Sequence, residues 1–573
     1  MASAKVKNTT SFSRTGIITM GVPFPKSEGL RVGDTLIAAG AYTSNNSNQK
    51  IQWYPQGARW DDGSVKYARV SFKVDLTSTE EKTVSILKSN TSTPITFVRN
   101  QQLWSNFLSS TFLFSIQGVN YTIPTSSLSL IEGGQTNDHY ARYKFFTHLP
   151  DAADPQIKYV WVELVAEVFS ALNYIQFYFR FGFYRFYPGQ ITTGVAPVML
   201  LSQPVTLNII GPRQKIRWEE YKTVSINTVS DTNKIYTLID PFSGGINQNK
   251  FAAGQSHAYK GVLTYETSNT ASAELEEQLL GMAIDWNNTF PVSGVIPPRP
   301  SYITSDADAL VRSNAILDLS SSGPKNNRGP YNWPTLSNVP DTRTSGDHGF
   351  RAYAFGMRGW PILLTTNYNW IPFLEWTTRQ QATRHNWYYG TDGNPIPPND
   401  FRNNNVRFWS GAMHSVPPAA FGGFTRAISN SSSNALADLP FSTGSYNQII
   451  WGPEKEHYTN TLFILQGMIT MDYFSLEFAK MHSKLWCYQN RTDNYPGTQT
   501  AIDNWGVSRA VGRNSHNVSF LYDFYADQEM KYWIETRLDY NYARNYVLSP
   551  ERIPGGTNVV RAVNVQAPCT QPA

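Results

Sequence analysis

The first half of the chain carries the alternating pattern of β-strands. From residue 10 to about residue 265, short runs of β-branched and aromatic residues are bounded by Gly, Asn, Ser or Pro. The clearest runs are GIITMGVPF (16–24), SVKYARVSFKVDL (64–76), KTVSILKS (82–89), KYVWVELVAEVF (158–169), PVTLNIIG (204–211), KTVSINTV (222–229) and KIYTLID (234–240). Their spacing predicts two consecutive β domains, sandwiches or barrels, that divide between residues 95 and 135.

One of these strands is aromatic on both faces. In IQFYFRFGFYRFYPG (175–189), phenylalanines occupy alternate positions from Phe177 to Phe183, and Tyr178, Arg180 and Tyr184 fill the opposite face. The phenylalanine face is predicted to be the core face. The other face could stack on sugar rings or cover a domain interface. The interface is favoured, because aromatic side chains are more often buried in packing than used to bind a ligand.

After SHAYKGVLTY (256–265) the period becomes helical. The spacing of apolar residues predicts a helix over SAELEEQLLGMAIDWNN (272–288), and the prolines of VIPPRP (295–300) are expected to end it. Three helical hairpins then recur, which predicts a helical toroid. They are 350–364 with 370–385, 457–469 with 473–486, and 508–525 with 529–547, and the second and third turn at TMD (470–472) and ADQ (526–528). The Gly, Pro and Asn-rich connections 319–347 and 388–452 either carry function or are insertions on this scaffold.

Composition narrows the class of protein. The 573 residues have a formal charge of +5, 16% charged and 14% aromatic residues, so no basic stripe marks a nucleic-acid partner. Abundant neutral polar residues suit neutral hydrogen bonding, and sugars are one ligand class that fits. Cys487 and Cys569 are too few for a disulfide framework. Neither a hydrophobic leader nor a membrane-spanning window of roughly 18 residues stands out, so we expect no membrane insertion and no ordinary export signal.

Two motifs near the amino terminus resemble a known family. GVPFPKSEGLRVGD (21–34) and GARWDDGSVKYARVSF (57–72) resemble the amino-terminal RIFT-type barrel of the rhamnogalacturonan exolyase-like proteins. The positions that carry the resemblance are Trp60, Asp62, Gly63, Ser64 and Tyr67. We expect Asp62 to hydrogen-bond forward, Gly63 to take a positive φ, and the Tyr67 ring to pack on the barrel.

This resemblance implies a multidomain β plus α protein. A RIFT-like β-barrel (1–110) and a β-sandwich (111–270) would precede an α/α toroid (271–573). The family's hairpins often turn on Thr-Gly-Asp after an earlier histidine. The chain keeps His457, Thr470 and Asp472 but has Met471 at the glycine position, a departure that concerns activity more than fold.

The implied activity is β-elimination on a uronic acid. A cation must neutralise the carboxylate so that a base can remove the C5 proton, while an acid protonates the leaving oxygen. Candidate catalytic residues are His457, Tyr458, Arg513 and His414, and candidate substrate-binding residues are Arg509, His516, Arg384 and His385. The competing interpretation is a solvated basic helix face at 509–516 and histidines packed in the structure. No metal or cofactor motif is present, so we expect no cofactor.

Two functions therefore stay open. One is a virion-associated or extracellular protein that recognises acidic cell-surface polysaccharide and, as a polysaccharide lyase, cleaves it. The other is a catalytically silent phage structural or adhesin protein. The expected partners are acidic polysaccharide or host surface glycan, and other virion proteins or a second copy. The expected location is the virion, with an extracellular or cytoplasmic place as the alternatives. A cytoplasmic metabolic enzyme is disfavoured by the missing cofactor motifs.

Overall fold

Strands dominate the part of the chain that the structure describes. The computed structural model describes residues 2–8, 11, 13–41, 49–150, 160–183, 198–218, 225–239, 250–252, 255–265, 282–285, 389, 393–394 and 467–489, and several positions between 522 and 535. The predicted β-rich first half is confirmed in these residues. No helix among them is both long enough and apolar enough to cross a bilayer.

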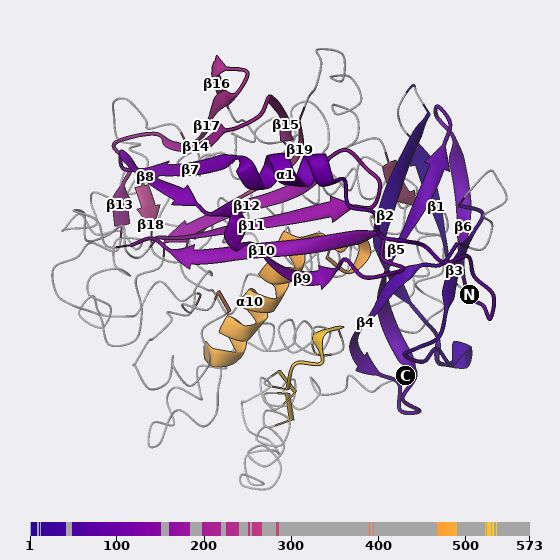
Figure 1. Ribbon diagram of the computed structural model, residues 1–573. Helices are drawn as coiled ribbons and strands as arrows, with labels where there is room; N and C mark the ends of the chain where they lie inside the picture. The colour runs from indigo at the N-terminus through magenta and orange to yellow at the C-terminus, as the bar shows by residue number, and fades with distance from the viewer. Residues whose placement is uncertain are drawn as a thin grey trace, which may run out of the picture.

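The first 90 residues, together with the remote strand β20, form two antiparallel sheets (Figure 1). One has the strand order β20-β1-β6-β3 and the other has the order β2-β5-β4. The strands are β1 (Ala2–Asn8), β2 (Arg14–Pro23), β3 (Leu36–Ala39), β4 (Gln52–Arg59), β5 (Val65–Leu76), β6 (Glu81–Lys88) and β20 (Met282–Asp285). A bridge between Ile37 and Lys50 links the sheets, and alternate residues such as Ile18, Phe72 and Val84 are buried.

The next residues form a β-sandwich. Its six-stranded sheet has the order β15-β19-β12-β11-β10-β9 and its five-stranded sheet has the order β16-β17-β14-β7-β8. The strands are β7 (Thr111–Ile116), β8 (Val119–Ile123), β9 (Ser129–Gly133), β10 (Tyr140–His148), β11 (Val160–Phe169), β12 (Ile175–Phe183), β14 (Val205–Ile210), β15 (Gln214–Trp218), β16 (Ser225–Ser230), β17 (Asn233–Ile239) and β19 (Gln255–Tyr265). A short pair, β13 (Val198–Leu200) and β18 (Lys250–Ala252), stands apart.

One core fills the space between these two sheets. Helix α1 (Gln101–Ser109), whose first turn is capped by the Asn100 side chain, contributes Leu103, Trp104 and Phe107 to it. The odd-numbered residues of β12, from Ile175 to Phe183, all belong to this core. The predicted phenylalanine core face is therefore confirmed.

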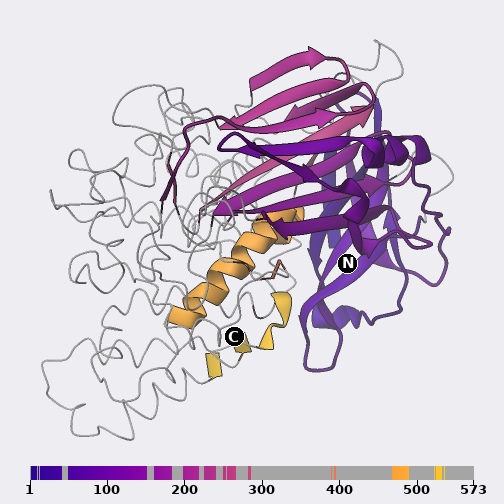
Figure 2. The ribbon, with the colours of Figure 1, turned by 60° about the vertical axis from the view of Figure 1, so that its left-hand side comes forward.

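The opposite face of the six-stranded sheet, here called the outer face, is covered by helix α10 (Tyr473–Gln489). Figures 1 and 2 show α10 crossing the sheet on the side away from the five-stranded sheet. The Tyr178 ring meets Phe474 edge-on at 5.1 Å, and the Arg180 guanidinium lies 5.5 Å from the same ring. The Tyr178 and Arg180 face of β12 therefore packs in an interface, here with α10, which is the favoured use of the two.

Part of the helical prediction needs correction. Residues 282–285 were expected to continue a helix over 272–288, but they form β20 and pair with β1. Helical periodicity is overridden here because the short strand completes a distant sheet. Helical residues are interrupted at 471–472 and at 526–527, within the turns predicted at 470–472 and 526–528. The hairpin at 350–385 lies outside the described residues, and within the described ranges neither a RIFT-type barrel nor an α/α toroid is shown.

Candidate functional site

A row of charged side chains crosses the outer face. The antiparallel register places Arg142 of β10 opposite both Glu132 of β9 and Glu167 of β11. The Arg142 Nε donates to Glu167 Oε1 at 2.7 Å, and its Nη1 lies 3.4 Å from Glu132 Oε2. Gln176 of β12 continues the row, because its amide donates to Glu167 Oε2 at 2.8 Å. Strand register thus builds a buried ladder of opposite charges.

Glu163 of β11 is the centre of a second group. Its Oε2 accepts from Arg180 Nε at 2.9 Å and forms an ion pair with Arg180 Nη2 at 2.7 Å, and its Oε1 contacts Lys144 Nζ at 2.9 Å. The Tyr473 hydroxyl of α10 donates to the same Oε1 at 2.8 Å. Burial would raise the pKa of Glu163, but Arg180 and Lys144 outweigh it and lower the pKa to about 2. Glu163 is therefore ionised at neutral pH.

Arg180 lies in a box of aromatic rings. Its guanidinium carbon is 4.9 Å from the Tyr389 ring centre, 5.1 Å from Trp161 and 5.6 Å from Phe478. Burial opposes its charge, yet Glu163, with smaller contributions from Tyr389, Tyr473 and Glu477, keeps the pKa of Arg180 above its usual range. Arginine suits this position because its flat guanidinium can stack on rings while it pairs with a carboxylate.

Arg69 of β5 connects the first domain to this row. It pairs with Glu132, which also accepts from the Tyr140 hydroxyl. Beside it, the Gln52 amide oxygen accepts from the backbone N–H of His139 at 2.6 Å and of Tyr140 at 3.0 Å. Burial lowers the pKa of Arg69 to about 10, so it stays a cation at neutral pH. The two β domains therefore share one polar interface.

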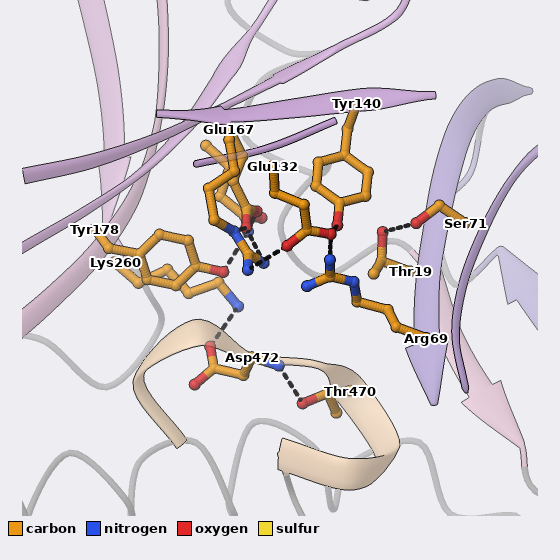
Figure 3. Close-up of polar contacts among 12 residues, drawn as sticks. Thr19, Arg69, Ser71, Glu132, Tyr140, Glu167, Tyr178, Lys260, Thr470 and Asp472 are labelled. Atoms are coloured by element: carbon orange, nitrogen blue, oxygen red, sulfur yellow. Dashed lines mark hydrogen bonds and ion pairs between the residues drawn. The ribbon is translucent and has the colours of Figure 1, made fainter. Parts of the chain in front are cut away.

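The turn before α10 closes the site from the other side (Figure 3). Asp472 caps α10 by accepting from Ser475 N at 2.9 Å, and its second oxygen lies 3.5 Å from Lys260 Nζ of β19. Thr470 Oγ1 accepts from Asp472 N at 3.2 Å. Met471, between them, has φ 54° and is buried, and glycine is the residue that usually takes this conformation.

These groups balance in charge, and together they are called the charge network. The cations are Arg69, Arg142, Lys144, Arg180 and Lys260, and the anions are Glu132, Glu163, Glu167, Asp472 and the half-buried Glu477. Burial raises the pKa of the Tyr140 hydroxyl to about 12 and those of Tyr178 and Tyr473 further. These phenols are neutral at pH 7, so they add no charge to the network, and their hydroxyls act in it as hydrogen-bonding groups.

The WDDG turn of the first domain behaves partly as expected. Asp62 Oδ1 accepts from Ser64 N at 2.8 Å, and Gly63 has φ 80°, so both predictions are confirmed. The Tyr67 ring was expected to pack on the barrel. Instead it meets Phe524 edge-on at 5.1 Å, and its hydroxyl donates to the Met468 carbonyl. The alternation of β5 explains this, because Tyr67 lies on the face turned away from the first domain's core.

The sequence-predicted site residues lie outside the described residues. They are His457, Tyr458, Arg513, His414, Arg509, His516, Arg384 and His385. Sequence reasoning missed Glu163 and Glu167, although both interrupt the otherwise apolar run YVWVELVAEVF on the same strand face. Carboxylates in a fully buried strand are a signal of paired buried charge. Among the described side chains, no group of three or more His, Cys, Asp or Glu could hold a metal ion.

Comparisons with known proteins find little that is similar. No family model and no curated protein matches the sequence. An alpha-mannosidase from Enterococcus faecalis V583 is 11% identical, with a TM-score of 0.27 over 49% of this chain and 45% of that one. A glycosyl hydrolase family 38 protein from Enterococcus faecalis is 10% identical, with a TM-score of 0.28 over 49% and 47%. The chain thus spans less than half of either structure, and scores this low assign neither a fold nor an activity.

These comparisons correct the resemblance to the rhamnogalacturonan exolyase-like family. The family models give no match, and the similar solved structures bear the name of a different family. The motif at residues 60–67 explains the error. Its turn geometry is generic, since an aspartate that hydrogen-bonds forward and a glycine of positive φ suit many tight turns.

Proposed function

We propose that this protein recognises polysaccharide at a surface and that its described part is a non-catalytic scaffold for that role. The observation that carries the proposal is the burial of the charge network. The side chains of Glu163 and Arg180 have 0% exposure and pair with each other. A general acid or base must come within hydrogen-bond reach of substrate, and α10 covers these groups. The outer face therefore supports a structural function.

Composition supports carbohydrate as the ligand. The chain combines 14% aromatic residues with few charged ones, and its loops are rich in neutral hydrogen-bonding side chains. Aromatic rings with a few placed polar groups are a common way to hold a small, uncharged ligand. The proposed partners are host surface glycan, acidic polysaccharide included, together with other virion proteins or a second copy, and the proposed location is the virion.

One experiment tests binding and cleavage together. The full chain would be immobilised and offered a panel of acidic and neutral polysaccharides by interferometry, while absorbance of unsaturated uronate is followed in solution. The expected result is saturable binding to at least one glycan with no rise in absorbance. Absence of binding across the panel would overturn glycan recognition. A rise in absorbance would overturn the non-catalytic role.

The second candidate is cleavage by β-elimination, which rests on the clustering of basic and phenolic residues near hairpin entries in the sequence. His457 and Tyr458 begin the predicted hairpin that turns at 470–472, and Arg513 lies in the first helix of the next predicted hairpin. A His457→Ala variant would abolish any cleavage if this candidate is right. Substitution of Lys5, which lies in an exposed pair with Glu81, is the matched control and should leave cleavage unchanged.

A further inference from the structure

Two hairpin turns far apart in the sequence have the same geometry. Met471 has φ 54° and its N–H donates to the Gly467 carbonyl at 2.9 Å. Ala526 has φ 52° and its N–H donates to the Tyr522 carbonyl at 2.7 Å. Each helix thus ends on a left-handed residue with the same backbone bond.

In both turns an aspartate follows and caps the next helix. Asp472 Oδ2 accepts from Ser475 N at 2.9 Å, and Asp527 Oδ1 accepts from Met530 N at 3.2 Å. An N-cap occupies only one oxygen of a carboxylate. The second oxygen and most of the negative charge are left for another partner.

In both turns the carboxylate also contacts a lysine, and this lysine comes from the element on which the turn packs. Asp472 Oδ1 lies 3.5 Å from Lys260 of β19, and Asp527 Oδ2 lies 2.9 Å from Lys484 of α10. The side chains of the second pair are 16% and 11% exposed, so water screens them little. The Tyr525 hydroxyl adds a contact between the same two layers by donating to the Leu476 carbonyl at 2.6 Å.

We infer that these capping aspartates are docking residues, and that each hairpin is fixed on the preceding layer by a lysine that pairs with the aspartate at its turn. The sheet presents Lys260 to the first hairpin, and the first hairpin presents Lys484 to the second. The docking is therefore ordered. Loss of the first pair loosens both hairpins, whereas loss of the second loosens only the second.

Substituting asparagine for the capping aspartate distinguishes the role of its charge in docking from its role as a helix cap. Asparagine caps a helix about as well as aspartate but has no charge. Hydrogen exchange of the full chain would be measured for Asp472→Asn and Asp527→Asn, with Lys484→Met as the partner variant. We expect Asp527→Asn and Lys484→Met each to speed exchange in 522–535 by about tenfold, with 473–489 unchanged, and the double variant to add little more. Asp472→Asn should speed exchange in both segments.

Three results would overturn this inference. They are unchanged exchange in 522–535 for Asp527→Asn, additive effects in the double variant, and faster exchange in 473–489 for Lys484→Met. Lys484→Arg keeps the charge and should restore protection, which guards against a general folding defect. Binding of glycan is measured separately, so failure here leaves the proposed function standing.

Discussion

At the scale of single residues, Glu163 joins three elements through one carboxylate. It contacts Arg180 of β12, Lys144 of β10 and Tyr473 of α10. A buried ion pair adds little net stability when it is complete, because desolvation offsets the attraction. Removing one partner is costly, since the other charge then stays buried without compensation.

Glu163→Gln should therefore destabilise the fold by about 3–5 kcal/mol, because Arg180 and Lys144 lose their anion. Urea unfolding followed by tryptophan fluorescence measures the loss. Glu81→Gln is the control, because its pair with Lys5 is 33% and 39% exposed and should contribute about 0–1 kcal/mol. Equal effects of the two substitutions would contradict the assigned role of burial.

Among the described residues, a buried histidine and a buried glutamate have the pKa shifts that matter most for stability against pH. Burial lowers the pKa of His139 to about 4 from 6.5, against a weaker effect of its bond to the Lys50 carbonyl, and Lys73 acts in the same direction as burial. A histidine kept neutral in the fold gives stability above pH 6.5 that is lost as pH falls towards 4. Glu163, lowered to about 2 from 4.5, gives stability above pH 4.5 that is lost towards pH 2.

The free energy of unfolding should thus fall in two steps on acidification. The upper step, between pH 6.5 and 4, should shrink in His139→Gln, and His148 should contribute to what is left because burial lowers its pKa to about 4 as well. Urea midpoints taken at half-unit pH intervals test this. An upper step of unchanged size in His139→Gln would remove the assignment.

At the scale of elements, the two left-handed turn residues should respond oppositely to glycine. A left-handed backbone costs a non-glycine residue about 1–2 kcal/mol. Ala526→Gly should relieve that cost and stabilise the second hairpin by about 1 kcal/mol, since Ala526 has only a methyl group to lose. Met471→Gly should destabilise by about 1–3 kcal/mol, because its side chain is 2% exposed and leaves a cavity. The melting temperatures of the two variants test this prediction. If both variants were more stable than the wild type, the Met471 side chain would be loosely packed.

The β-rich class of the first half, several of its strands and some turns were predictable from the sequence, whereas the site was not. Alternation located β2, β5, β6, β11, β12, β14 and β17, because each has at least one face in a core. The strand β20 was missed because its partner β1 is remote in sequence. The charge network was missed for a related reason. Which cations meet Glu163 depends on the register of β11 with β10 and with β12, and its hydroxyl partner depends on where α10 docks; none of these is a local property.

At the scale of the whole molecule, the two β domains are joined by side chains of β4, β5, β9 and β10. Arg69 pairs with Glu132, and the Gln52 amide takes two backbone N–H groups of the sandwich. Such an interface couples the unfolding of the two domains. Without buried ion pairs or hydrogen bonds of this kind, a small polar interface would let the two domains move relative to each other.

Arg69→Met should therefore separate one calorimetric transition into two, because Glu132 loses a buried partner at this interface. Arg213→Met is the control, since Arg213 pairs with Asp231 at the surface, with side chains 36% and 60% exposed. A single transition at the wild-type temperature in Arg69→Met would show that the domains are coupled elsewhere.

Because β20 pairs with β1, the four-stranded sheet can be completed only late in synthesis on the ribosome. Strands β1 to β6 are synthesised by residue 88, yet their four-stranded sheet gains its last member only with residues 282–285. At the usual pace of translation this leaves the nascent sheet with an open edge along β1 for about 10–40 s. An open edge is where a growing polypeptide can pair wrongly with its neighbour on a polysome. Ribosome pausing between these segments should therefore lower the yield of native protein.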